Sequence, residues 1–281
     1  MQALVNSARQ KGSVLVAGLD PSPDRIPPEI QTRNLPEPRA AYEFCRDILE
    51  AVDDEVAAVK LQSAYFERMG PPGIEVYAEL LNDASKLGLP TIADVKRGDI
   101  GPVAAAYAEA HLSVHGATCV TVNPYMGEDA VRPFLEETRR LNRDGGVFVL
   151  VATSNPSAAT LQDATDPPVY ELAANLVEEL GASSGEYIDA GAVVGVTRPE
   201  VGRRVRELLP DALFLSPGFG AQGGGAAGVR SLLDRRGGGV LVNSSRGILY
   251  AYEGSDLEYR EAAREAARAA RLELTAAGVG F

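Results

Sequence analysis

One short cluster of charged residues is the part of the chain best suited to chemistry. It occupies positions 94–99, with the sequence DVKRGD, at the end of an apolar run. Side chains alternate along a strand, so Asp94 and Lys96 are expected on one face, with Asp99 just beyond in the loop. Carboxylates that flank an ammonium keep it charged, because opposite charges favour the ionised forms. The cluster therefore indicates either a charged catalytic array or a structural ring of salt bridges.

The scarcity of lysine favours the catalytic interpretation. Only four of the 27 lysines and arginines are lysines, at positions 11, 60, 86 and 96. Lysine carries a compact ammonium that can release its proton, which arginine does not do. Lys60 also ends an apolar run, so two of the four lysines are expected at neighbouring strand ends.

Eight short apolar runs recur along the chain and are separated by helical patterns. They lie at residues 14–19, 56–59, 91–95, 118–122, 147–152, 192–196, 212–215 and 239–242. Runs that are almost continuously apolar are typical of parallel strands covered on both faces. Eight strands alternating with helices predict an α/β fold, the (β/α)8 TIM barrel, with an open doubly wound sheet as the alternative. The length of 281 residues suits a single catalytic barrel domain spanning residues 1–281.

Helical periodicity fills the gaps between these runs. The expected helices lie at residues 38–51, 73–87, 103–115, 130–141, 170–180, 199–208, 226–235 and 256–277. Ser255 is expected to cap the last of them. The polar segment 155–168 is interpreted as a long loop after the fifth strand.

Polar residues end most of the expected strands, where barrels of this kind carry their active sites. Besides the two lysines and Asp94, these residues are Asp20, Asn123, Thr153, Ser154, Thr197, Asn243 and Ser244. The loops after strands seven and eight often bind phosphate, and here they contain the glycine-rich stretch 218–225 and Arg246. Glycine lets backbone N–H groups approach an anion, and arginine adds a bidentate fork. A merely flexible loop is the alternative. The stretch also spells a dinucleotide-binding pattern, which we discount because no βαβ unit follows it.

Charge and composition exclude several classes of function. The formal net charge of −12 disfavours nucleic acid and anionic membranes as partners. The chain has no apolar run of 18 residues and no apolar signal core, so we expect a cytoplasmic protein. Cys45 and Cys119 are expected to be free, buried thiols. His111 and His115 lie four residues apart without a third ligand, so they are interpreted as packing or surface residues and no metal site is expected.

Several segments together resemble orotidine 5′-phosphate decarboxylases, in the longer bacterial and archaeal branch of the family. The central one is Asp94-x-Lys96-x-x-Asp99 followed by Ile-Gly. Matching segments are 18–21, 59–67, 153–156 and 216–224, so the resemblance spans most of the chain. The central pattern alone is shared with related sugar-phosphate decarboxylases, but its combination with Lys60 and the Gln222 loop is more specific.

The resemblance implies catalytic roles for four residues and no cofactor. Lys96 would donate a proton to the ring carbon that loses carbon dioxide, and Asp94 would lie against the substrate carboxylate. Asp99 would reach across the interface of a homodimer into the partner's site. Lys60 would hold the array and bind a ribose hydroxyl. A fixed cationic charge suits this reaction, because it stabilises the negative charge that develops on the ring.

The resemblance also implies a site for a nucleotide substrate. Asp20 would bind the ribose with Lys60, Ser154 would contact the pyrimidine edge, and Gln222 and Arg246 would grip the phosphate. Asn123, at the end of the fourth strand, is taken as a further substrate contact.

One departure from the family pattern concerns substrate binding. Pro102 and Val103 follow Gly101, where the family usually has a small polar residue and then a threonine that touches the ribose. Two other interpretations of the chain stay open. One is a sugar-phosphate decarboxylase of the same superfamily, which would need Mg²⁺. The other is a barrel that binds a nucleotide without turning it over.

Overall fold

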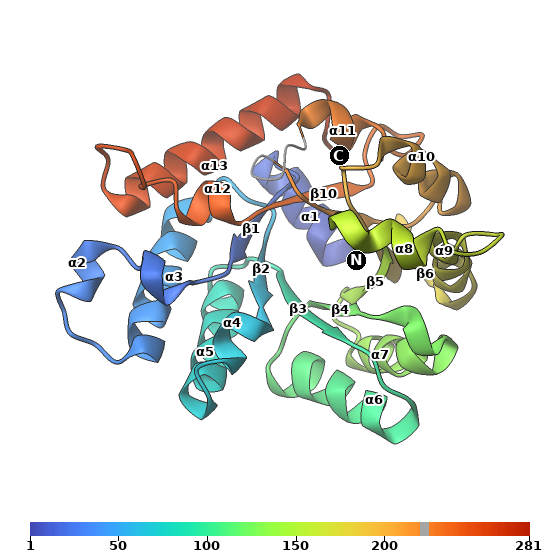
Figure 1. The fold of residues 1–281 in the computed structure, drawn as a ribbon, viewed down its shortest axis with the longest axis horizontal. Helices are drawn as coiled ribbons and strands as arrows, with labels where there is room; N and C mark the ends of the chain where they lie inside the picture. The colour runs from blue at the N-terminus through green and yellow to red at the C-terminus, as the bar shows by residue number, and fades with distance from the viewer. Residues whose placement is uncertain (220–224) are drawn as a thin grey trace.

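The strands form a closed barrel. The computed structural model describes residues 1–219 and 225–281, and within them eight parallel strands close on themselves, with β1 paired to β10 (Figure 1). In order around the barrel they are β1 (Leu15–Leu19), β2 (Ala58–Gln62), β3 (Thr91–Arg97), β4 (Cys119–Val122), β5 (Gly146–Ala152), β8 (Ala190–Val194), β9 (Phe214–Pro217) and β10 (Val240–Ser244). This confirms the predicted (β/α)8 barrel and excludes the open doubly wound sheet. The remaining short strands, β6 (Ser183–Ser184) and β7 (Tyr187–Ile188), form an antiparallel pair.

Helices surround the barrel (Figure 1). The main ones are α3 (Glu37–Val52), α5 (Pro71–Lys86), α6 (Gly101–Ala108), α7 (Glu128–Leu141), α9 (Val169–Leu180), α10 (Pro199–Leu208) and α13 (Tyr259–Ala276). Shorter helices are α2 (Pro28–Gln31), α4 (Ser63–Glu67), α8 (Ala159–Gln162), α11 (Ala226–Arg230) and α12 (Arg246–Leu249). Proline begins α5 and α10, where its missing N–H would have no helical partner. In the part of the chain that is described, no helix combines the length and apolar character needed to cross a bilayer.

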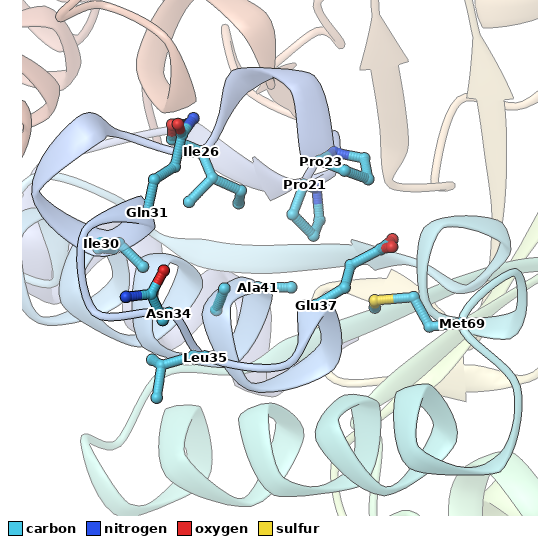
Figure 2. Close-up of a pocket in the computed structure, with 11 residues that line it drawn as sticks. Pro21, Pro23, Ile26, Ile30, Gln31, Asn34, Leu35, Glu37, Ala41 and Met69 are labelled. Atoms are coloured by element: carbon cyan, nitrogen blue, oxygen red, sulfur yellow. The ribbon is translucent and has the colours of Figure 1, made fainter.

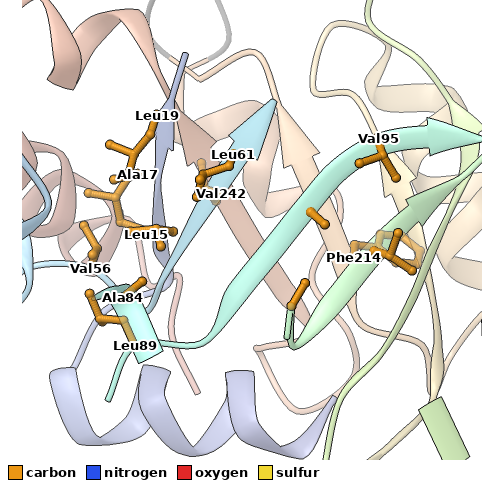
Figure 3. Close-up of a cluster of buried hydrophobic side chains, with 14 of the residues drawn as sticks. Leu15, Ala17, Leu19, Val56, Leu61, Ala84, Leu89, Val95, Phe214 and Val242 are labelled. Carbon is orange, nitrogen blue, oxygen red and sulfur yellow. The ribbon is translucent and has the colours of Figure 1, made fainter. Parts of the chain in front are cut away.

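The main core lies between the strands and the surrounding helices. Figure 3 shows Leu15, Ala17 and Leu19 on one side of β1, and this face is buried with Phe44 and Ile48 of α3. The alternate strand residues, such as Val16, belong to a second cluster inside the barrel. Both faces of the sheet are therefore apolar, which explains the continuous apolar runs in the sequence. Cys45 and Cys119 are both free and buried, as expected.

A helix before the first strand closes the bottom of the barrel and was not expected from the sequence. α1 (Gln2–Lys11) ends at Gly12, whose left-handed backbone (φ 56°) terminates the helix. Leu4 and Val5 belong to the cluster inside the barrel, and Ser7 Oγ donates to the Ala57 carbonyl at 2.6 Å, just before β2. Because α1 covers the N-terminal ends of the strands, the C-terminal ends carry the open mouth.

Four local predictions were wrong. Ser255 does not cap the last helix, because its hydroxyl accepts from Leu257 N–H in a preceding turn, and the carboxylate of Glu258 caps Arg260 N–H instead. The helix predicted at 103–115 ends as α-helix at Ala108 and continues as a π-helical turn, Glu109–Val114. The helix predicted at 226–235 stops at residue 230, and the segment 155–168, expected to be a loop, contains α8.

Candidate active site

Four polar side chains meet on the carboxylate of Asp94 at the mouth of the barrel. Its Oδ2 accepts from Lys60 Nζ at 2.9 Å and from Gln62 Nε2 at 3.2 Å, both from β2. Its Oδ1 accepts from Lys96 Nζ at 2.6 Å and from Thr121 Oγ1, on β4, at 2.9 Å. Three neighbouring strands therefore contribute to one network of hydrogen bonds and ion pairs, in which Asp94 and Lys96 meet as the spacing predicted.

Burial and pairing hold this network in its charged form. Burial alone would raise the pKa of Asp94, but the charges and hydrogen bonds of Lys60 and Lys96 outweigh it and hold the pKa well below its usual range. Burial would likewise lower the pKa of Lys60, yet Asp20 and Asp94 hold it above its ordinary value. Lys60 Nζ lies 3.6 Å from Oδ1 of Asp20, the residue that follows β1. The ammonium of Lys96 differs because its side chain is 44% exposed, so it can meet a bound molecule.

Three of these residues, Asp20, Lys60 and Asp94, line a cavity of about 420 Å³ at the C-terminal ends of the strands. Gly218 and Arg246 line the same cavity, and Lys96 does not line it but is bonded to Asp94, which does. Arg246 begins α12, directly after β10, so the barrel brings it to the same opening as the charged network. Gln222 lies outside the described residues. A cationic side chain and a cluster of alternating charge therefore face one space, which suits a ligand with a phosphate at one end and a reacting group at the other.

Besides Lys96, three predicted residues among those described do not line this cavity. Ser154 lines a separate opening with Thr197 and Arg198, after β5 and β8. Asn123 accepts from Tyr125 N–H with its side chain and so caps a turn. Asp99 accepts from Ile100 N–H at 2.8 Å, and within residues 1–219 and 225–281 its carboxylate has no cationic partner at ion-pair distance.

Four residues in or beside the cavity had not been assigned a role. Gln62 and Thr121 both bind Asp94. Gln62 ends β2 and Thr121 is the last residue but one of β4, so a polar residue near a strand end was the available signal. Tyr250 donates to the Asp20 carbonyl at 2.8 Å and accepts from Ser22 N–H, although nothing in the sequence distinguishes it from other tyrosines. Asn243 was noted as a polar strand end, and among the described residues its buried Oδ1 has no hydrogen-bond partner.

A second cavity, also of about 420 Å³, lies beside the segment between β1 and α3 (Figure 2). Pro21, Ile26, Ile30, Leu35 and Met69 give it a mostly apolar wall. Its one ionisable side chain is Glu37, and none of the charged residues at the barrel mouth lines it. Its chemistry therefore makes it a weaker candidate for catalysis than the cavity at the barrel mouth. In the described part of the chain, no group of three His, Cys, Asp or Glu side chains is arranged to hold a metal.

Comparisons with known proteins agree with the resemblance read from the motifs. The family described as "Orotidine 5'-phosphate decarboxylase / HUMPS family" matches residues 13–262. An orotidine 5′-phosphate decarboxylase of Rhodopirellula baltica is 42% identical over 260 residues, which cover 86% of this chain and 85% of that protein. The protein of that name in Deinococcus radiodurans is 39% identical over 278 residues, covering 98% and 97%.

Solved structures lead to the same family. The structure of Leishmania donovani OMP decarboxylase superimposes with a TM-score of 0.80 at 32% sequence identity, covering 98% of this chain and 97% of that one. The residues matched by the family, 13–262, span all eight barrel strands. The chain therefore belongs to the orotidine 5′-phosphate decarboxylase / HUMPS family.

Proposed function

We propose that this chain converts orotidine 5′-monophosphate to uridine 5′-monophosphate and carbon dioxide in pyrimidine biosynthesis, with Lys96 as the proton donor. Membership of the family supports a decarboxylase. The observation that carries the proposal is the network at the barrel mouth, in which Asp94 binds Lys60 and Lys96 beside a cavity that Arg246 also lines.

The chemistry follows from the charges of this network. When the bond to the carboxyl group breaks, its electron pair stays on the ring carbon, and the ammonium of Lys96 stabilises that charge and then transfers a proton to the same carbon. Lys96 regains a proton from solvent, which its partly exposed side chain can reach. Asp94 is held ionised, so it would lie as a carboxylate against the carboxylate that leaves. No cofactor takes part in these steps.

The other site residues are proposed to bind the nucleotide. Asp20 and Lys60 line the cavity next to Asp94 and would bind ribose hydroxyls, while Arg246 would hold the phosphate. Phosphate binding at a distance from the reacting carbon can supply energy for orientation. We also propose phosphate contact by Gln222 and base contact by Ser154. Asn123 is a weaker proposal, because its side chain already caps a turn.

A homodimer is proposed to complete each site with Asp99. Among the described residues, no cation lies at ion-pair distance from the Asp99 carboxylate. The segments that follow β3 and β4 carry exposed apolar side chains: Ile100, Val103, Tyr125 and Met126 are each about half exposed or more. An exposed apolar patch of this kind marks an interaction surface, and a second copy would bury it. We further propose that residues 1–281 act as one catalytic unit in the cytoplasm.

The first experiment is a decarboxylation assay with excess EDTA. We expect purified protein to change the ultraviolet absorbance of orotidine 5′-monophosphate, with Lys96→Ala inactive and Lys86→Ala, an exposed lysine on α5, fully active. Activity that requires Mg²⁺ would favour a sugar-phosphate decarboxylase, to which the family description also extends. Tight nucleotide binding without turnover, in every salt concentration tried, would favour a binding protein.

A mixing experiment tests the shared site. Lys96→Ala and Asp99→Ala chains are each expected to be inactive, but a heterodimer of the two has one site with both residues intact. Random exchange of equal amounts should therefore restore about a quarter of the wild-type activity, because about half of the dimers are mixed and half of their sites are whole. If subunit exchange is verified and activity does not return, Asp99 does not serve the partner's site.

A further inference from the structure

The backbone of Lys96 adopts an unusual conformation. Its φ is +46°, in the left-handed region, which residues with a β-carbon seldom adopt. The other described non-glycine residues with positive φ are Asn34, Asn142 and Asp144, of types that tolerate this region. Such a conformation costs on the order of 1–2 kcal/mol and persists only where the surroundings impose it. The left-handed conformation of Lys96 therefore needs a structural cause.

A bulge between β3 and β4 surrounds this residue. Ala93 pairs with Val120, but the next pair joins Arg97 to Val122, so β3 advances four residues while β4 advances two. Residues 94–96 on β3 thus lie opposite Thr121 alone. Bulges of this kind redirect side chains and are common beside active sites. In a regular strand the ladder would continue through Asp94 and Lys96, so Thr121 occupies the place where the two strands lose their register.

The hydroxyl of Thr121 holds both of the charged residues opposite it. It accepts from the backbone N–H of Lys96 at 3.0 Å and donates to Asp94 Oδ1 at 2.9 Å. One hydroxyl can do both, because it has one proton and two lone pairs. The side chain is 1% exposed, so water cannot replace these bonds without rearrangement. The same Oδ1 accepts from Lys96 Nζ, so the hydroxyl links the backbone of Lys96 to the partner of its ammonium.

We propose that Thr121 is a positioning residue for the reaction. It holds the Lys96 backbone in the left-handed conformation and thereby directs the ammonium to the place where it meets both Asp94 and the reacting carbon. This inference rests on the proposed function of Lys96. Thr121 itself is expected to touch no substrate, because it does not line the cavity, whereas its partner Asp94 does. Loss of its hydroxyl should therefore lower kcat far more than it raises KM.

The test compares Thr121→Val with two matched variants. Valine keeps the shape of threonine but can neither accept from Lys96 nor donate to Asp94. Thr121→Ser keeps the hydroxyl and loses the methyl group. Thr118→Val is the control: Thr118 Oγ1 also accepts from a β3 backbone N–H, that of Thr91 at 3.1 Å, but at the opposite end of the strands.

We expect Thr121→Val to lower kcat by about 10- to 100-fold, as small misplacements of reacting groups do, with KM within about threefold of wild type. Thr121→Ser should recover most of the rate, and Thr118→Val should stay near the wild-type rate while losing comparable thermal stability. A crystal structure of Thr121→Val should show φ of Lys96 outside the left-handed region. If Thr121→Val does not fold, Thr121→Cys replaces it, because a thiol is similar in size but bonds weakly.

Two results would overturn the inference. One is a folded Thr121→Val protein whose kcat matches that of Thr118→Val. The other is a left-handed Lys96 that persists in the crystal structure of Thr121→Val. Absence of turnover by the wild-type protein would instead refute the proposed function, and the conformation of Lys96 in the variant would still decide whether Thr121 holds it.

Discussion

Replacing Lys60 with methionine measures how strongly the charged network contributes to folding. The side chain of Lys60 is only 7% exposed, and its ammonium lies 2.9 Å from Asp94 and 3.6 Å from Asp20. With an effective dielectric constant of about 20, Coulomb's law gives attractions of roughly 6 and 5 kcal/mol for these two pairs. The cost of burying the charges offsets most of that sum. Removing one partner of a buried ion pair nevertheless costs about 3–5 kcal/mol, because the remaining charges stay buried.

The assay is urea unfolding at neutral pH, with Lys86→Met as the matched control. Lys86 Nζ lies 2.8 Å from Asp83 Oδ1, a distance like that of the buried pair, but its side chain is 65% exposed. Exposed pairs contribute about 0–1 kcal/mol, so the control should lose no more than that. The two variants therefore separate the effect of burial from the effect of distance.

The pH dependence of the Lys60→Met effect has a definite sign. Burial opposes the charged form, but Asp20 and Asp94 raise the pKa of Lys60 above its ordinary value. The stability that this group contributes is fully present below the ordinary lysine pKa of about 10.4 and is lost only as pH rises through the folded-state value. The difference between wild type and variant should therefore be constant from about pH 6 to about pH 9. A loss of less than about 1 kcal/mol, or one equal to that of Lys86→Met, would refute this reasoning.

Two further predictions concern a buried histidine and a glycine beside the site. Burial, reinforced by Arg97 and His115, lowers the pKa of His111 to about 4. Between about pH 4 and 6.5 the unfolded chain therefore binds a proton at this histidine that the folded chain does not bind. The free energy of unfolding should rise with pH across that window by at most about 3 kcal/mol. In His111→Phe this rise of the unfolding free energy with pH should vanish. Urea unfolding at pH 5 and pH 7 measures it, and an equal change in the unfolding free energy in wild type and variant would contradict the prediction. A β-carbon added at Gly18 would lie 1.9 Å from Ser245 Oγ, so Gly18→Ala should displace the residue before Arg246 and lower kcat/KM by about tenfold or more. Gly280→Ala, where the added carbon meets nothing within 4 Å, should leave steady-state rates unchanged, and equal rates in both variants would argue against the close approach at Gly18.

Much of the architecture could be predicted because it depends on patterns that are local in the sequence. Parallel strands buried on both faces appear as continuous apolar runs, and their number and the helices between them indicate a barrel. The helix boundaries were less predictable. Ser255 is a good capping residue by type, but the turn that follows it uses its hydroxyl, and the helix begins three residues later than predicted. α1 was not predicted from the sequence, because the contacts that stabilise it are with the apolar interior of the barrel that it covers.

The sequence by itself determined which ionisable residues end neighbouring strands, and so it predicted that Lys60, Asp94 and Lys96 would meet. Strand alternation leads to that expectation, since it is a property of the local backbone. Only the tertiary structure decided how they meet. The left-handed conformation of Lys96 depends on Thr121 in a different strand, because a bulge is a mismatch between two strands and neither strand encodes it alone. The same holds for Asp99, which lies three residues after the lysine but whose carboxylate, within the described residues, accepts from Ile100 N–H and has no cation at ion-pair distance.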